Sequence, residues 1–318
     1  MKVHTPQFDW LLTGEPFVQY RTLVDLLDKK VTDRHVQSVK KAIRNHRLIR
    51  SIFKKRNKSG FWGSADEIFK WWPKKDSTFW VLGVLADFGF SKQDKDVVPA
   101  CEYVFSKQMT SGAFGWAPPP TPGDCFTGIL AESLSNLGYV DDPRLKKAYA
   151  WLARRQRLDG GFWCKATGQP GKPRQAEPSC AYATLCTLGA LALHPTYKNS
   201  VVAEKALEFL LTCWDKRGKI KYAGHDSHIG SGWEKLKYPH TDYRILKFLD
   251  IIAQFDSART DPRVQSMIDM LVSKQDKDGR YRAESIHKAW SGFDFAQKEK
   301  PSRWITFIVY YILKRMNA

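Results

Sequence analysis

Two aspartates stand at the start of long apolar stretches, where a carboxyl group could do chemistry. Asp124 precedes CFTGILAESLSNLG and Asp242 precedes YRILKFLDIIAQF. At the mouth of an apolar cavity, such a carboxyl has a raised pKa and can act as a general acid. Each aspartate could instead cap the following helix, because its oxygens accept hydrogen bonds from the first N–H groups. Both are therefore candidate catalytic residues, with capping as the alternative.

Four basic residues lie just before, or at the start of, similar apolar stretches: Lys172, Arg174, Arg244 and Arg303. Basic side chains and helix N-termini both attract phosphate groups, so these four are candidate substrate-binding residues. The alternative is ordinary surface charge, because the chain has 51 Lys and Arg against 33 Asp and Glu, a net charge of +18. This excess favours acidic partners: nucleic acid, an anionic membrane or a phosphorylated ligand.

The stretches that must position these residues are of two kinds. Segments that are apolar nearly all round predict interior helices, and four such segments occur: 77–89, 125–138, 179–193 and 242–255. Counted with 16–28 and 301–316, they give six candidate inner helices. Amphipathic segments such as 142–156 and 261–275 predict surface helices, and both of these begin with Asp-Pro, a helix cap followed by a first-turn residue. The two kinds alternate along the chain, which predicts paired inner and outer helices.

Between the helix pairs the sequence returns to a glycine followed by aromatic or β-prone residues. The key glycines are 60, 112, 160, 218 and 279, spaced by 52, 48, 58 and 61 residues. Such a period indicates a helical repeat. The chain, 1–318, is predicted to be one all-α domain, an (α/α)6-type toroid closed around a central cavity. An open solenoid of the same repeats is the alternative.

QRLDGGFW at 156–163 is the most specific piece of the repeat. A helical repeat that ends in this way resembles the prenyltransferase and squalene-cyclase repeat superfamily, also described as terpenoid cyclase-like, over roughly residues 75–316. The overall layout is similar to small stand-alone bacterial or archaeal members. The resemblance implies a deep aromatic-lined cavity that holds an isoprenoid chain.

Two enzyme templates within this superfamily can be compared with the sequence. Class II terpene cyclases carry an Asp-x-Asp-Asp acid, which this chain lacks, since Asp141-Asp142 is interpreted as a helix cap. Protein prenyltransferase β subunits carry basic residues that hold a diphosphate, then an acid and a cysteine, and later a histidine that completes a zinc site. Lys172, Arg174, Glu177, Cys180 and His240 follow that order, although the acid stands three residues before the cysteine instead of two.

This second resemblance implies zinc bound by Glu177, Cys180 and His240, with Asp242 as another possible carboxylate. Thiolate, imidazole and carboxylate all suit tetrahedral Zn²⁺, which could hold an incoming thiol as the thiolate. The alternative is that Cys180 is a small buried residue and that His240 lies beside a helix cap. We expect no other cofactor.

Aromatic residues stand within the first turn of five predicted inner helices. If the toroid forms, they should converge on one rim and line the substrate cavity, where their faces can also stabilise a cation. The alternative is ordinary core packing. The five residues are Trp80, Phe126, Tyr182, Tyr243 and Trp304.

Residues 34–58 contain ten Lys and Arg and no acid, with apolar residues interleaved. They form either an outer helix pair with a solvated face or a patch for anionic lipid or nucleic acid. Neither a signal peptide nor a window of about 18 apolar residues is found. The six cysteines form no CxxC pair, so we expect a cytoplasmic protein, peripheral at the membrane if the basic segment binds lipid.

These observations predict an isoprenoid- or lipid-handling protein that resembles prenyltransferases and terpene cyclases, and an enzymatic role is favoured. Its small-molecule partner should be hydrophobic or carry a diphosphate. The alternative is a non-enzymatic binding protein that uses the toroid as a scaffold and whose basic surface docks on nucleic acid or on an anionic membrane, because a fold does not by itself determine a function.

Overall fold

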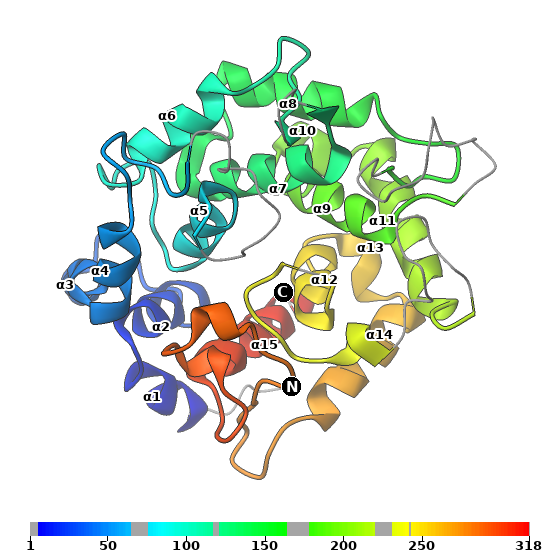
Figure 1. Ribbon diagram of the computed structural model, residues 1–318. Coiled ribbons are helices and arrows are strands. Elements are labelled where there is room, and N and C mark those ends of the chain that lie inside the picture. The colour runs from blue at the N-terminus through cyan, green and yellow to red at the C-terminus, as the bar shows by residue number, and fades with distance from the viewer. Residues whose placement is uncertain are drawn as a thin grey trace. The chain divides into compact units, whose positions relative to one another are not determined.

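Helices account for nearly all the regular structure in the computed structural model, which describes residues 6–64, 76–116, 121–163, 178–219, 231–241 and 243–317 (Figure 1). Within these ranges the only strands are β1 (Gly115–Trp116) and β2 (Thr121–Pro122), which pair antiparallel. The chain groups into two units: unit 1 is Met1–Arg56 with Glu234–Ala318, and unit 2 is Asn57–Trp233. No helix within the described ranges is long and apolar enough to cross a bilayer.

Unit 2 contains three apolar helices and their amphipathic partners. The apolar helices are α5 (Thr78–Asp87), α7 (Asp124–Leu134) and α9 (Ala181–Leu191). The partners are α6 (Val98–Ser106), α8 (Pro143–Ala153) and α11 (Val201–Asp215). Helix α7 packs between α5 and α9, while α6 lies on α5, α8 on α7 and α9, and α11 on α9 (Figure 1). All eleven residues of α9 are buried, as its uniformly apolar sequence predicts.

Unit 1 combines helices from both ends of the chain. From the N-terminal end come α1 (Pro6–Leu12), α2 (Pro16–Arg21), the π-helical turn η1 (Thr22–Leu26), α3 (Arg34–Asn45) and α4 (Arg47–Lys54). From the C-terminal end come α12 (Ile245–Ile252), α13 (Asp256–Arg259), α14 (Pro262–Ser273) and α15 (Arg303–Met316). Helix α15 contacts α1, α2, η1 and α12, and α14 packs on α12.

Short elements complete the described ranges. They are η2 (Ser135–Tyr139), α10 (Pro195–Lys198), η4 (Ser231–Glu234), η5 (Lys288–Trp290) and η6 (Asp294–Ala296).

The five predicted glycine turns are confirmed, because each key glycine has φ between +76° and +96°. At Gly112 and Gly160 the backbone also approaches the neighbouring outer helix. A Cβ atom would lie 2.4 Å from the Lys147 carbonyl oxygen at Gly112 and 2.5 Å from that of Lys205 at Gly160. Both the left-handed conformation and the close approach therefore require glycine.

The glutamine that precedes two of these turns ties the turn to the next outer helix. Gln156 Nε2 donates to the carbonyl oxygens of Gly160 (2.9 Å) and Val202 (2.7 Å), and Gln108 does the same one repeat earlier. In the last repeat, Gln275 donates to the Tyr310 hydroxyl (2.9 Å), which in turn donates to the Gly279 carbonyl (2.8 Å). In this repeat, the link between the glutamine and the glycine carbonyl thus runs through Tyr310 of α15.

A buried threonine fastens the aromatic part of each of four turns to an apolar helix. In every case its hydroxyl oxygen accepts a hydrogen bond of 2.8 to 3.0 Å from the backbone N–H of an aromatic residue. We call this contact the threonine clamp. Its four pairs are Trp62–Thr78, Phe114–Thr127, Phe162–Thr184 and Tyr281–Thr306. Each turn is thereby held beside the start of the helix that follows it.

The predicted Asp-Pro caps are also confirmed. Asp142 and Asp261 accept hydrogen bonds from the backbone N–H groups of Arg144 (2.9 Å) and Arg263 (2.8 Å), at the starts of α8 and α14. The guanidinium group of each arginine also donates to the same carboxylate, with 2.7 Å between its Nη2 and the Oδ2 atom of the aspartate. This hydrogen bond lowers the pKa of both aspartates. Asp142 is therefore a helix cap, as expected in the absence of an Asp-x-Asp-Asp motif.

Candidate functional site

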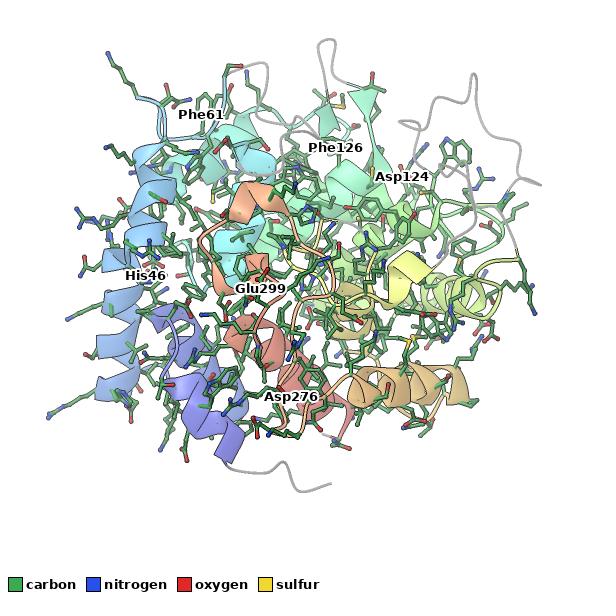
Figure 2. The ribbon with its side chains drawn as sticks, turned by 60° about the horizontal axis from the view of Figure 1, so that its bottom comes forward. His46, Phe61, Asp124, Phe126, Asp276 and Glu299 are labelled. Carbon is green, nitrogen blue, oxygen red and sulfur yellow. The ribbon has the colours of Figure 1, made fainter. Side chains whose placement is uncertain are left out.

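Asp124 is the first residue of α7 (Figure 2). The residue is 1% exposed. Its Oδ2 accepts a hydrogen bond from the backbone N–H of Trp163 (3.0 Å), and its Oδ1 accepts one from Arg155 Nε (3.1 Å). Both donors come from the DGGFW repeat turn and the end of α8. The carboxyl therefore connects the start of an apolar helix to the next repeat turn and is held in one orientation.

The environment of Asp124 perturbs its ionisation. Burial raises the pKa of Asp124 to about 6, and this effect outweighs the opposing influence of the Arg155 and Arg157 guanidinium groups and of the Trp163 N–H. Arg157 is itself buried and lies over the Trp163 ring, with 5.3 Å from its Cζ atom to the ring centroid. A buried acid that titrates near neutral pH, with two guanidinium groups beside it, is suited to proton transfer.

Trp163 completes the polar surroundings of this carboxyl. The residue is 5% exposed, and its indole Nε1–H is buried and has no hydrogen-bond partner among the residues that the structure describes. An unpaired buried donor is uncommon in folded proteins. The residue whose backbone binds Asp124 thus also carries a donor that a polar group of a substrate could accept.

Buried aromatic side chains follow Asp124 within unit 2. Phe126, the third residue of α7, stacks on Phe79 of α5 with 4.5 Å between ring centroids, and the rings of Phe79 and Trp80 pack edge to face. Tyr182 of α9 is buried as well. Figure 2 shows Phe126 and Asp124 at the start of the same helix.

The threonine clamp gives a register for the five predicted cavity aromatics. Tyr182 and Trp304 both lie two residues before a clamp threonine, whereas Phe126 lies one residue before and Trp80 two residues after. Trp304 is buried, and Tyr243 is partly exposed next to the start of α12. Four of the five are thus interior residues, but they occupy three different helical positions. Their convergence on one cavity stays a prediction.

The structure describes two of the three predicted zinc ligands, and these two belong to different units. Cys180 caps α9 in unit 2, where its sulfur accepts a hydrogen bond from the Ala183 N–H (3.4 Å). His240 belongs to unit 1, and its Nδ1 is buried and has no hydrogen-bond partner within the described part of the chain. Burial lowers the pKa of His240 to about 3, so the ring is neutral, as a metal ligand must be. Glu177 and Asp242 lie outside the described residues, and zinc stays a prediction.

Elsewhere, no three His, Cys, Asp or Glu residues of the described ranges lie close enough together to hold a metal ion. The five cysteines within those ranges are buried and form no disulfide.

The predicted phosphate-binding residues are only partly described. Lys172 and Arg174 lie outside the described residues. Arg244 is the residue before α12 and is partly exposed. Arg303 begins α15, but its Nε donates to the Trp10 carbonyl (3.1 Å), one of its terminal nitrogens donates to Thr13 (3.1 Å), and its guanidinium lies over the Trp10 ring. Arg303 therefore holds α1 against α15, and a role in substrate binding stays a prediction.

Unit 1 contains a second carboxyl of interest that sequence reasoning missed, on Asp294, a partly exposed residue with one buried carboxyl oxygen. Asp294 Oδ2 accepts a hydrogen bond from the Trp304 N–H (3.2 Å) at the start of α15, while its Oδ1 is buried and has no partner among the residues described. Burial, reinforced by the negative charge of Glu15, raises the pKa of Asp294 to about 7. The flanking Phe293 and Phe295 stack on each other with 5.0 Å between centroids. The only sequence signal was an aspartate between two aromatic residues, in a segment without the repeat motif.

Asp294 should make stability depend on pH between about 4 and 7. Its pKa is 3.8 in a reference peptide and about 7 in the folded protein, so folding favours the protonated form. Its contribution is complete below pH 4 and is lost as the pH rises through 7. We expect Asp294→Asn to flatten this pH dependence. At pH 8 its free energy of unfolding should exceed that of the wild type, by no more than about 4 kcal/mol.

Urea unfolding at pH 5 and pH 8 measures this effect, with the exposed Asp9→Asn as the matched control. Parallel pH dependence in the wild type and in Asp294→Asn would show that Asp294 ionises normally in the folded protein.

Comparison with known proteins identifies the family. The family model of the prenyltransferase alpha-alpha toroid domain matches residues 22–213 and, in an overlapping second match, residues 130–297. The chain belongs to this family, which confirms the predicted all-α toroid class and the resemblance on which it was based. No protein with a curated description matches the sequence.

Several solved structures are similar to this chain at low identity. A protein from Actinoplanes is 15% identical, with 96% of this chain and 90% of that chain covered and a TM-score of 0.45. The type II terpene cyclase MstE from Scytonema is 14% identical over 85% of this chain and 96% of that chain (TM-score 0.36). A polysaccharide lyase is 11% identical over 95% and 89% (TM-score 0.48). No functional conclusion rests on these similarities.

Proposed function

We propose that this protein is an enzyme that acts on an isoprenoid-type substrate and that Asp124 is its general acid. The observation that carries the proposal is the Asp124 carboxyl, which is buried, oriented by two hydrogen bonds and has a pKa raised to about 6. General acids are most effective when their pKa lies near the working pH. Membership of the prenyltransferase toroid family supports the isoprenoid class.

In this proposal the protonated Asp124 gives its proton to an oxygen or an alkene carbon of the substrate and is left as a carboxylate. The guanidinium groups of Arg155 and Arg157 stabilise that carboxylate, because both favour the ionised form. The positive charge that develops on the substrate is stabilised by nearby aromatic faces, for which Phe79 and Phe126 are candidates. The Trp163 indole N–H offers a donor to a polar group of the substrate.

The test measures both binding and turnover. Calorimetry follows the titration of the protein with farnesyl diphosphate, geranylgeranyl diphosphate or geranylgeraniol. Mass spectrometry then identifies any product formed from each compound. We expect Asp124→Asn to bind within about threefold of the wild type and to lose at least about 100-fold in turnover, the usual contribution of a general acid. Wild-type turnover should fall as the pH rises through about 6, because the acid must be protonated.

Asp141→Asn, which alters an exposed aspartate next to the α8 cap, is the matched control and should behave as wild type. Melting curves confirm that the Asp124 variant is folded, since an asparagine offers only one oxygen to the two donors. Normal turnover in Asp124→Asn removes the catalytic role. A wild type that binds a prenyl compound without converting it overturns the enzymatic proposal and supports a carrier or scaffold.

A further inference from the structure

One surface of unit 1 carries a concentration of positive charge. We define the α3–α4 basic face by its six exposed basic residues, which are Arg34, Lys41, Arg44, Arg47, Arg50 and Lys54. No aspartate or glutamate occurs between residues 34 and 58. Figure 2 shows nitrogen-tipped side chains projecting outward from these two helices, which meet at His46.

The fold determines which way these side chains point. Val36, Val39 and Ile43 of α3, and Ile49 and Ile52 of α4, are buried. These five residues therefore belong to the core and are not available to insert into a bilayer, while Leu48 and Phe53 are partly exposed. Any partner of this face must bind by charge.

The two acids that most closely precede the segment are already engaged. Asp33 caps α3 by accepting from the N–H groups of His35 (2.8 Å) and Val36 (3.2 Å). Asp28 accepts from Lys314 Nζ (2.6 Å) at the opposite end of the chain. Six positive charges along two consecutive helices repel one another, and a polyanionic surface relieves that repulsion.

We propose that the α3–α4 basic face docks the protein on an anionic membrane surface. The loop before α3 favours a bilayer over nucleic acid. Val31 is 58% exposed between Lys29, Lys30 and Arg34, and it is one of three large exposed hydrophobic residues in the described ranges. An apolar side chain among lysines fits the boundary between headgroups and acyl chains, whereas a phosphate backbone offers it nothing. The proposal is independent of Asp124.

Co-sedimentation with vesicles tests this docking. Vesicles of phosphatidylcholine alone are compared with vesicles that contain about 30 mol% phosphatidylserine, for the wild type and for Lys41→Glu/Arg44→Glu/Arg47→Glu. Each basic residue near such a surface contributes about fivefold to partitioning, so the variant should lose at least about 100-fold. Wild-type binding should require phosphatidylserine and should weaken strongly with salt.

A matched control separates this face from net charge. Lys146→Glu/Lys147→Glu/Arg154→Glu changes three exposed basic residues of α8 and its end in unit 2 by the same total charge and should retain most of the binding. Equal losses in the two variants overturn the proposal, because the attraction would then be non-specific. A wild type that ignores both vesicles, or that binds a DNA duplex but no vesicle, overturns it as well.

Discussion

Leu185→Asp should unfold most of the protein at room temperature. Leu185 lies in the middle of α9, where every residue is buried, so the aspartate would have to ionise in apolar surroundings or remain protonated without partners. We expect a loss of more than about 5 kcal/mol in the free energy of unfolding, comparable to the whole stability of many domains. Urea titration followed by circular dichroism measures it.

The matched control is Leu158→Asp, because Leu158 is 84% exposed in the repeat turn and its replacement should cost less than about 0.5 kcal/mol. If Leu185→Asp is insoluble, Leu185→Ala gives a graded version, with an expected loss of about 2–5 kcal/mol. Similar midpoints for the two Leu→Asp variants would show that α9 is not an interior helix.

Gly128→Ala should destabilise the protein by about 3 kcal/mol, although alanine is the better helix former. Gly128 lies where the backbones of α7 and α9 approach each other closely. An added Cβ would lie 2.7 Å from the carbonyl carbon and oxygen of Cys186 and 2.8 Å from the backbone nitrogen of Thr187. Backbone atoms cannot rotate away as a side chain can, so the two helices would have to separate.

Gly83→Ala is the control for this prediction. Gly83 also lies inside an apolar helix, α5, but its added Cβ would meet only the Ser133 side-chain oxygen, at 3.1 Å. We expect a change within about 1 kcal/mol of the wild type, helped by the better helix propensity of alanine. Thermal melting of both variants decides the matter, and a Gly128→Ala midpoint at or above that of Gly83→Ala contradicts the close approach of α7 and α9.

The repeat architecture was predictable because local chemistry specifies it. Only glycine readily adopts the left-handed conformation of the repeat turns, and uniformly apolar stretches such as 179–193 have no polar face to expose. The capping of α8 by Asp142 follows from an equally local signal, the Asp-Pro pair.

The threonine clamp was not found because its spacing varies. The aromatic residue and its threonine are 16, 13, 22 and 25 residues apart in the four clamps, so a search for a fixed period cannot align them. The same limit applies to Asp124 and Arg155, which are separated by 31 residues and lie on different helical elements. Sequence indicated a carboxyl at the start of an apolar helix, but not the guanidinium that accompanies it.

Asp294 illustrates a different limit. Its raised pKa comes from burial and from the charge of Glu15, a residue near the other end of the chain. Nothing local distinguishes it from a surface turn aspartate such as Asp276, which accepts hydrogen bonds from Asp278 and Arg280 in its own turn. The difference between the two aspartates becomes visible only in the folded unit, where Asp294 meets residues that are distant in the sequence.

The composition of unit 1 has a consequence for biosynthesis. Lys314 reaches Asp28 and the carbonyl oxygens of Asp25 and Leu26, and Arg303 reaches Trp10, across about 290 residues of sequence. During translation, α1 to α4 leave the ribosome long before α15 exists, whereas all of unit 2 is contiguous and can pack as it emerges. The apolar surface of α1 and α2 that packs against α15 therefore stays uncovered until α15 has been synthesised. That interval is when a ribosome-bound chaperone has the most reason to bind this chain.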